Sequence, residues 1–114
     1  MDGISAYDGL QMAIVDVQSR LAEMAELGKQ KALAERSYKI AKRQRILMER
    51  QKGTPMSIIQ DVVRGCCDIS LLAYNRDIAV TMYEANYESL LASKKLVDTY
   101  REVIAREYAD AASR

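Results

Sequence analysis

Apolar residues recur every three or four positions over most of the chain, the spacing of one face of an α-helix. In the first half they form a heptad seam that runs to Met24 and then continues from Leu27 in a displaced register, with the shift beside Gly28. This predicts a helix over about residues 5–52 that packs along another helix. The change of phase predicts a local unwinding or kink at Gly28 and leaves open whether the helix breaks there. The seam consists of Tyr7, Leu10, Ile14, Val17, Leu21 and Met24, then Leu27, Ala34, Tyr38, Ala41 and Met48, with Lys31 and Arg45 at its weak positions.

The second half of the chain carries a seam in one unbroken heptad frame. It predicts a helix over about residues 67–110, with Asp68 as its cap. The seam comprises Ile69, Leu72, Ala79, Tyr83, Leu90, Val97, Tyr100 and Ile104, interrupted by Arg76, Asn86 and Ser93. A second apolar stripe beside it comprises Leu71, Ile78, Met82 and Ala85. A face this broad contacts more than one partner helix.

The sequence Gly53-Thr54-Pro55 predicts the turn between the two long helices. Gly53 suits the left-handed position that ends a helix, while Thr54 and Pro55 suit the cap and first position of the next. A short helix is therefore expected over about residues 55–64, ended by Gly65 as a second left-handed residue.

Two helices of similar length, each about 65–70 Å long at 1.5 Å per residue, are expected to form an antiparallel hairpin. The fold class is thus all-α, with the 114 residues in a single helical domain.

A two-helix hairpin leaves part of the apolar surface uncovered, including Ile46 and Leu47, and such patches usually mark interfaces. A twofold homodimer that closes into a helical bundle is the commonest way to cover them. A monomer whose short helix folds back and a hetero-complex are the alternatives. The expected partner-binding residues, at the turn and on the second stripe, are Met56, Ile58, Ile59, Leu71, Ile78 and Met82.

The composition, 49% apolar and 29% charged, excludes an intrinsically disordered chain, and a single proline permits long helices. No apolar run approaches the ~18 residues of a membrane-spanning helix. The start, Met1-Asp2-Gly3-Ile4, has no basic-then-apolar signal pattern, so a cytoplasmic location is expected. The adjacent Cys66 and Cys67 are expected to be reduced thiols that serve in packing.

Charge is segregated along the first predicted helix, although the formal net charge is only +1. Residues 1–28 contain five acids and one base, for a net charge of −4, whereas residues 29–52 contain nine bases and two acids, for a net charge of +7. A basic stripe is what a nucleic-acid backbone requires, and aromatic residues for base stacking are scarce beside it. The candidate contacts are Arg36, Lys39, Lys42, Arg43, Arg45, Arg50 and Arg64. The alternative is a solvated face whose bases pair with acids of a neighbouring helix, for which the candidates are Asp61, Asp68, Asp77 and Glu84.

Residue types that catalysis usually needs are missing from the sequence. Without histidine there is no imidazole base and no histidine metal ligand, and there is no Gly-rich phosphate loop. Two cysteines alone make a poor zinc site, and neither has a visible base to activate it. We therefore predict a protein that is not an enzyme and uses no cofactor, metal or small-molecule substrate.

Four short motifs lie between residues 53 and 108: Gly53-Thr54-Pro55, Arg64-Gly65, Arg76-Asp77-Ile78-Ala79 and Arg106-Glu107-Tyr108. In this order they resemble a group of small helical proteins encoded by bacteriophages and prophages of Gram-positive bacteria, with Tyr108 where a larger aromatic is usual. That group has no agreed biochemical activity, and its genes often lie near replication and recombination genes. The resemblance implies a phage accessory role in the cytoplasm of a bacterial host, and it transfers no catalytic residue.

Three functions remain open at this stage. The first is a non-enzymatic protein that binds a protein partner, in a phage setting a host replication, repair or defence factor. The second is a nucleic-acid-binding protein in phage replication or recombination, contacting the backbone through the basic half of the first helix. The third is a virion scaffold or assembly protein that associates through its coiled coil.

Overall fold

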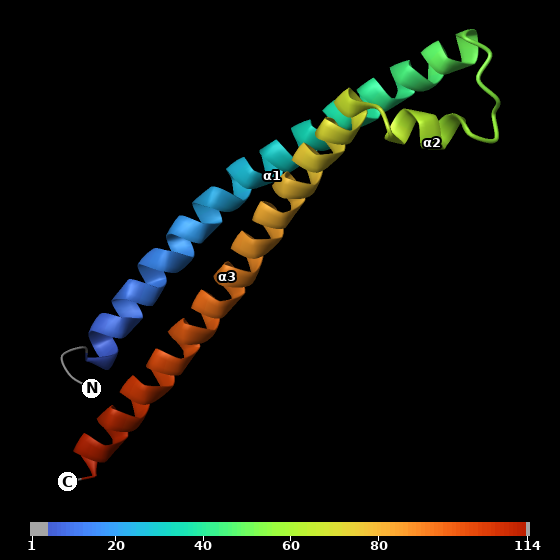
Figure 1. Cartoon of the computed structure of the whole chain (residues 1–114). Coiled ribbons are helices and arrows are strands. Elements are labelled where there is room, and N and C mark those ends of the chain that lie inside the picture. The colour runs from blue at the N-terminus through green and yellow to red at the C-terminus, as the bar shows by residue number, and fades with distance from the viewer. Residues whose placement is uncertain (1–4, 114) are drawn as a thin grey trace. The chain divides into compact units, whose positions relative to one another are not determined.

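The computed structural model of the chain describes residues 5–113, and every regular element among them is a helix. The helices are α1 (Ala6–Gln51), α2 (Ile59–Arg64) and α3 (Cys67–Ala112), shown in Figure 1. The predicted all-α hairpin, with a short helix at the turn, is confirmed. The acidic segment Met1–Ile4 lies outside the described residues.

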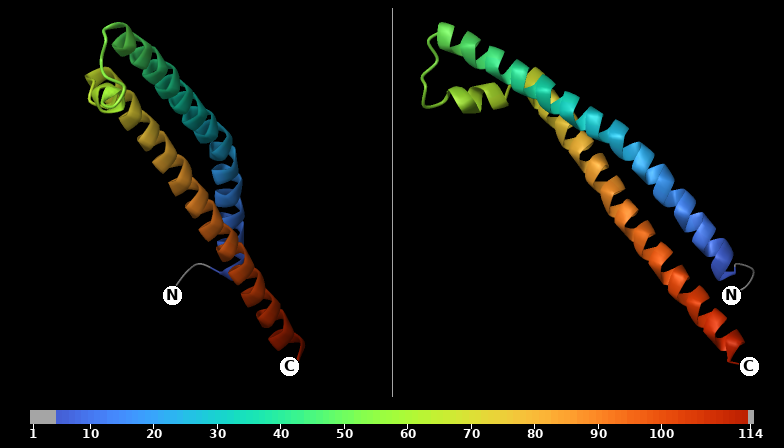
Figure 2. Two further views of the ribbon diagram at one scale, coloured as in Figure 1. Left: turned by 90° about the vertical axis from the view of Figure 1, so that its right-hand side faces the viewer. Right: turned by 180° about the vertical axis from the view of Figure 1, so that it is seen from behind.

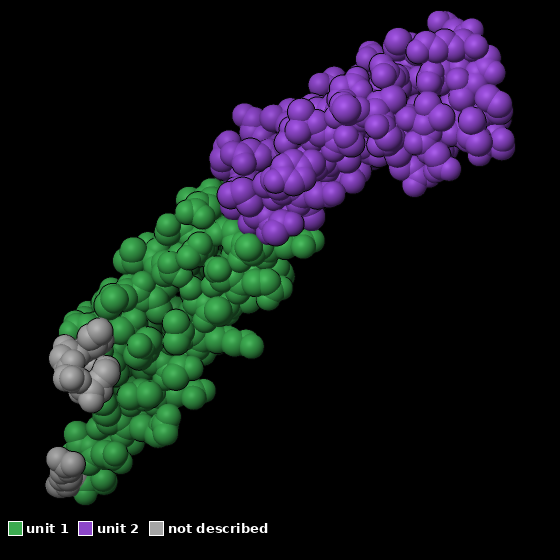
Figure 3. Space-filling model, viewed as in Figure 1, with its two compact units in different colours: residues 1–25, 84–114 green, residues 26–83 purple. Residues whose placement is uncertain are grey.

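The chain forms two compact units, coloured separately in Figure 3. Unit 1 comprises Met1–Ala25 and Glu84–Arg114, and unit 2 comprises Glu26–Tyr83. In each unit a segment of α1 runs antiparallel to a segment of α3, as the views in Figure 2 show, and unit 2 also contains α2. That the chain behaves as a single domain stays a prediction.

The seam of α3 lies where the heptad frame predicts it. Ile69 and Leu90 are buried, and so are the polar interruptions Asn86 and Ser93. The other predicted seam residues of this helix are half-buried, namely Leu72, Arg76, Ala79, Tyr83, Val97, Tyr100 and Ile104. The unbroken heptad frame therefore predicted correctly which face of α3 packs against α1.

The seam of α1 was predicted less accurately. Tyr7, Leu21 and Met48 are exposed, whereas Gly9 and Ala13 are buried in unit 1. A contact between two helices buries only a narrow strip, and here the strip runs through small residues. α1 also continues through position 28 as one α-helix, so the helix is neither broken nor unwound at Gly28, and a kink there stays a prediction.

The end of α1 is the left-handed glycine turn that the sequence predicts. Gly53 has a φ of +86°, and its N–H donates to the Arg50 carbonyl at 3.1 Å. The Thr54 N–H donates to the Glu49 carbonyl at 3.0 Å. Together these bonds form a Schellman motif, which satisfies carbonyls that the helix end would otherwise leave unpaired.

The start of α2 was predicted wrongly. Pro55 does not begin the helix, because its carbonyl accepts a hydrogen bond from the Ile58 N–H at 3.1 Å and closes a separate turn. α2 begins at Ile59, and no side chain caps it. Thr54 is not its cap, because the residue at the cap position of α2 is Ile58.

Two further predicted boundary roles are also wrong. Gly65 follows α2 with a φ of −81°, which is not left-handed, and its N–H donates to the Asp61 carbonyl at 3.1 Å. Asp68 lies inside the first turn of α3 rather than before it. There its carboxylate accepts a hydrogen bond from the Ile69 N–H at 3.0 Å and lies at the positive end of the helix dipole.

Polar contacts join the two long helices within each unit. In unit 1 the Asn86 side-chain amide donates to the Arg20 carbonyl at 3.0 Å, and the Ser93 hydroxyl donates to the Asp16 carboxylate. In unit 2 the Arg76 guanidinium lies 4.3 Å from the centre of the Tyr38 ring. Buried polar contacts of this kind favour one register of the helices over others.

Candidate interaction surface

An apolar stripe lies on the face of α1 that points away from the seam in unit 2. Leu33, Ile40 and Leu47 are spaced by seven residues, and 52%, 43% and 45% of their surfaces are exposed. Each comes two positions after a half-buried seam residue, and two positions correspond to a rotation of about 200° around the helix axis. These side chains therefore point to the side of α1 opposite the seam. The stripe is therefore not available to the antiparallel helix of the same unit.

Three arginines alternate with these apolar residues. Arg36, Arg43 and Arg50 each follow one of them by three positions and are exposed. None of the three forms an ion pair with another described residue. We call this alternating row the α1 outer stripe; its members are Leu33, Arg36, Ile40, Arg43, Leu47 and Arg50.

A shallow hollow of about 350 Å³ lies beside the outer stripe. Basic side chains form much of its edge, and the Tyr38 ring contributes a flat wall over which the Lys42 ammonium sits at 5.7 Å. The lining residues are Tyr38, Lys39, Lys42, Arg43, Ile46, Leu47 and Arg50. Four of the seven predicted nucleic-acid contacts are thus brought together on one surface.

The other three candidate basic residues lie outside this hollow. Arg45 points inward, where its Nε donates to Cys66 Sγ at 3.3 Å and a terminal nitrogen lies 3.9 Å from the Asp68 carboxylate. The hydrogen bond to Cys66, with the charges of Cys66 and Asp68, raises the pKa of Arg45 above its ordinary value. Arg64, on α2, pairs with Asp61 at 3.5 Å. Arg36 is exposed on α1 but does not line the hollow.

Acids within unit 2 neutralise little of the outer stripe. Glu49 is buried and lies 3.6 Å from Lys52, and its Oε2 has no hydrogen-bond partner among the described residues. Glu35 lies 3.6 Å from Lys39. The Asp77 carboxylate lies 3.0 Å from Arg76 on its own helix. The positive charge of the outer stripe therefore faces solvent.

The predicted docking residues divide into exposed and buried ones. Met56 and Ile58 are exposed at the turn. The prediction that Ile59 binds a partner is wrong, because this residue is only 3% exposed and belongs to the core of unit 2 with Val63 and Ile69. The predicted residues on α3 are exposed, and with Tyr74 they make an α3 outer stripe: Leu71, Tyr74, Ile78 and Met82.

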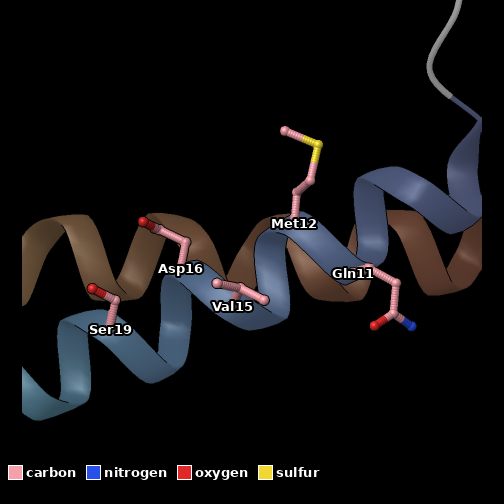
Figure 4. A pocket seen from close by; sticks show the side chains of 5 residues that line it. All are labelled: Gln11, Met12, Val15, Asp16 and Ser19. Carbon is pink, nitrogen blue, oxygen red and sulfur yellow. The ribbon is translucent and has the colours of Figure 1, made fainter.

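Unit 1 has an exposed apolar patch that the seam pattern did not predict. Met12 and Val15 are 63% and 62% exposed and line a hollow of about 500 Å³ with Gln11, Asp16 and Ser19. All five side chains come from α1, as Figure 4 shows. With the exposed Asp8 one turn earlier, Met12, Val15 and Asp16 form what we call the acidic patch.

A pattern in the sequence identifies part of this unpredicted surface. Met12, Leu33, Ile40 and Leu47 are all separated by multiples of seven and so share one heptad position. That position lies outside the hairpin seam. A second heptad frame on one helix therefore indicates a second contact surface.

The described residues offer little for metal binding or membrane insertion. No group of three or more potential metal ligands is found among residues 5–113. Cys66 and Cys67 carry free thiols. Within the same range no helix combines the length and apolar character needed to span a bilayer.

The chain was compared with protein-family models, with curated proteins and with solved structures, and it matches none of them.

Proposed function

We propose that the chain is a non-enzymatic interaction protein that self-associates through its long helices and docks a protein partner. The α1 outer stripe is the observation that carries this proposal. Apolar side chains seven residues apart on an exposed helix face suit burial against another helix. The phage resemblance would make the docked partner a host replication, repair or defence factor.

The alternation of apolar and basic residues favours a protein over a nucleic-acid backbone as the ligand. A phosphate backbone contacts cations and gains nothing from the intervening Leu33, Ile40 and Leu47. An amphipathic helix would cover these three side chains and place carboxylates beside the arginines. The apolar residues and the arginines of the stripe would then both contact the partner.

Apolar burial alone is a modest driving force for association. Fully burying a Leu or Ile side chain contributes about 1.5–3 kcal/mol, so three half-covered ones contribute roughly 2–5 kcal/mol together. Association costs about 4 kcal/mol or more in lost translation and rotation. A stable complex therefore needs the arginines to find acidic partners as well.

Sedimentation velocity over about 1–100 µM protein tests the proposal in the concentration range of ordinary protein–protein affinities. We expect the protein to associate as its concentration rises. Ile40→Glu should shift the equilibrium to the monomer, because it places a charge at the centre of the stripe. Gln60→Glu is the matched control, since it also adds one negative charge and Gln60 is exposed on α2, outside the stripe. A strictly monomeric wild type, or an Ile40→Glu variant that associates normally, contradicts the proposal.

A second candidate function, nucleic-acid binding, is favoured by the hollow that gathers Lys39, Lys42, Arg43 and Arg50. A fluorescence anisotropy titration of duplex and single-stranded DNA at about 50 and 200 mM salt distinguishes it. Micromolar binding that weakens by about 100-fold with salt indicates several phosphate contacts. Absence of binding at low salt excludes this function. Growth of oligomers without limit would instead favour the third candidate, an assembly scaffold.

A further inference from the structure

We propose that the α1 outer stripe of one copy binds the acidic patch of a second copy. This inference rests on the self-association in the proposed function and names the surface that meets the stripe. It commits to one occupant, the exposed face of unit 1 that carries Asp8, Met12, Val15 and Asp16.

The two surfaces are complementary in charge. The outer stripe carries three arginines without an ion-pair partner among the described residues, and the acidic patch carries two carboxylates. Asp8 forms no ion pair within the described part of the chain. Asp16 keeps 45% of its side chain exposed despite its contact with Arg20 at 3.7 Å. The outer stripe thus offers positive charge, and the acidic patch offers negative charge.

A second copy is needed because both surfaces belong to one helix, α1. Side chains on a helix reach only residues about three or four positions away on the same helix. The basic and acidic surfaces therefore cannot neutralise each other within that helix. Two copies of α1 side by side can bring the basic surface of one against the acidic surface of the other.

The spacing of the two surfaces matches in an antiparallel arrangement. Asp8 and Asp16 are eight residues apart, about 12 Å along a helix, and Arg43 and Arg50 are seven residues apart, about 10 Å. The apolar Met12 then lies opposite the Leu47 region, with acids beside arginines. An antiparallel pairing also sets the positive end of one helix dipole beside the negative end of the other.

Other occupants from a second copy fit less well. Pairing the outer stripe with itself places Arg43 among other arginines, and like charges at close range repel. The α3 outer stripe has Asp77 nearby, but that carboxylate is already held by Arg76 at 3.0 Å. The acidic patch is the better partner because Asp8 has no such contact among the described residues.

A charge-swap experiment tests the inference. Arg43→Glu/Arg50→Glu makes the stripe acidic, and Asp8→Arg/Gln11→Arg makes the patch basic while leaving the Asp16 contact to Ser93 intact. Each double variant alone should associate about 10-fold more weakly or worse than the wild type in sedimentation velocity. An equimolar mixture of the two should regain association, because each altered surface then meets an opposite charge.

Arg64→Glu/Lys95→Glu is the matched control for Arg43→Glu/Arg50→Glu, since it replaces the same number of basic residues by glutamate at exposed positions outside both surfaces. It should associate like the wild type. Circular dichroism of every variant establishes that the helices are retained. If the control loses association as strongly as Arg43→Glu/Arg50→Glu, net charge rather than this contact is responsible, and the inference is wrong.

The outcomes separate the inference from the proposed function. If both double variants associate like the wild type while Ile40→Glu does not, self-association stands and the acidic patch is the wrong occupant. The same conclusion follows if the mixture fails to regain association. If Ile40→Glu also has no effect, or the wild type is monomeric, the proposed function fails as well.

Discussion

Two tyrosine rings of α3 lie against glycines of α1, one pair in each unit. A Cβ atom at Gly9 would lie 2.5 Å from the Tyr100 ring, closer than atoms tolerate. A Cβ atom at Gly28 would lie 3.4 Å from the Tyr83 ring, which is ordinary van der Waals contact. A side chain at position 9 therefore requires the Tyr100 ring to shift, whereas one at position 28 needs no such shift.

Replacing these glycines by alanine should have opposite effects on the free energy of unfolding. Alanine gains about 1 kcal/mol over glycine in a helix interior, so Gly28→Ala should stabilise the protein by about that amount. At Gly9 overpacking costs about 1–3 kcal/mol, so Gly9→Ala should be destabilising overall. Urea denaturation followed by circular dichroism measures both. Equal stabilisation by the two substitutions would show that the Tyr100 ring moves aside freely.

The buried Asn86 offers a second test at a single side chain. Its amide donates to the Arg20 carbonyl, and its own oxygen lies 3.4 Å from an Arg20 guanidinium nitrogen. Asn86→Ala removes these contacts and should cost about 1–3 kcal/mol of unfolding free energy. Asn75→Ala, at an exposed position of the same helix, should change it by less than about 0.5 kcal/mol. Similar urea midpoints for the two variants would contradict the assigned role.

The boundaries of the helices depend on backbone geometry that differs between two glycines. Gly53 ends α1 with a φ of +86°, and a Cβ atom at this position would have no neighbour within 4 Å, so only the backbone conformation resists substitution. Gly65 has a φ of −81°, which any residue adopts. The sequence predicted a left-handed conformation for both glycines, and of the two Gly53 adopts it.

Gly53→Ala should lower the free energy of unfolding by about 1 kcal/mol, because a left-handed conformation costs a residue with a Cβ about that much. Gly65→Ala should be neutral or slightly stabilising, since it restricts the unfolded chain at a compatible φ. Thermal melts followed by circular dichroism compare the two. A loss at Gly65 equal to that at Gly53 would contradict this difference.

For the molecule as a whole, the segregation of charge along α1 makes association depend on salt. Exposed ion pairs are screened over about 10 Å at 0.1 M salt, whereas apolar burial is not. We therefore expect self-association to weaken several-fold between about 50 and 500 mM salt. Sedimentation velocity at both salt concentrations measures this. Association that stays constant or strengthens with salt would mean that apolar contact alone holds the copies together.

The two long helices were predictable from the sequence to different degrees. The frame of α3 is unbroken, and its seam residues lie where the pattern placed them, from Ile69 to Ile104. The frame of α1 is ambiguous because a second heptad position, occupied by Leu33, Ile40 and Leu47, is also apolar. A pattern that supports two faces cannot say which of them packs inside the hairpin.

The residue pattern alone establishes the helices, the turn at Gly53 and the separation of charge, because these depend on residues close together in the chain. It also predicts the hairpin, because two apolar seams of similar length joined by a short turn bury each other. Only the tertiary structure decides which surfaces remain free. It buries Ile59, turns Arg45 inward toward Cys66, and leaves the α1 outer stripe uncovered. The reason is that exposure depends on what another segment covers, and one helix can cover only one side of its neighbour.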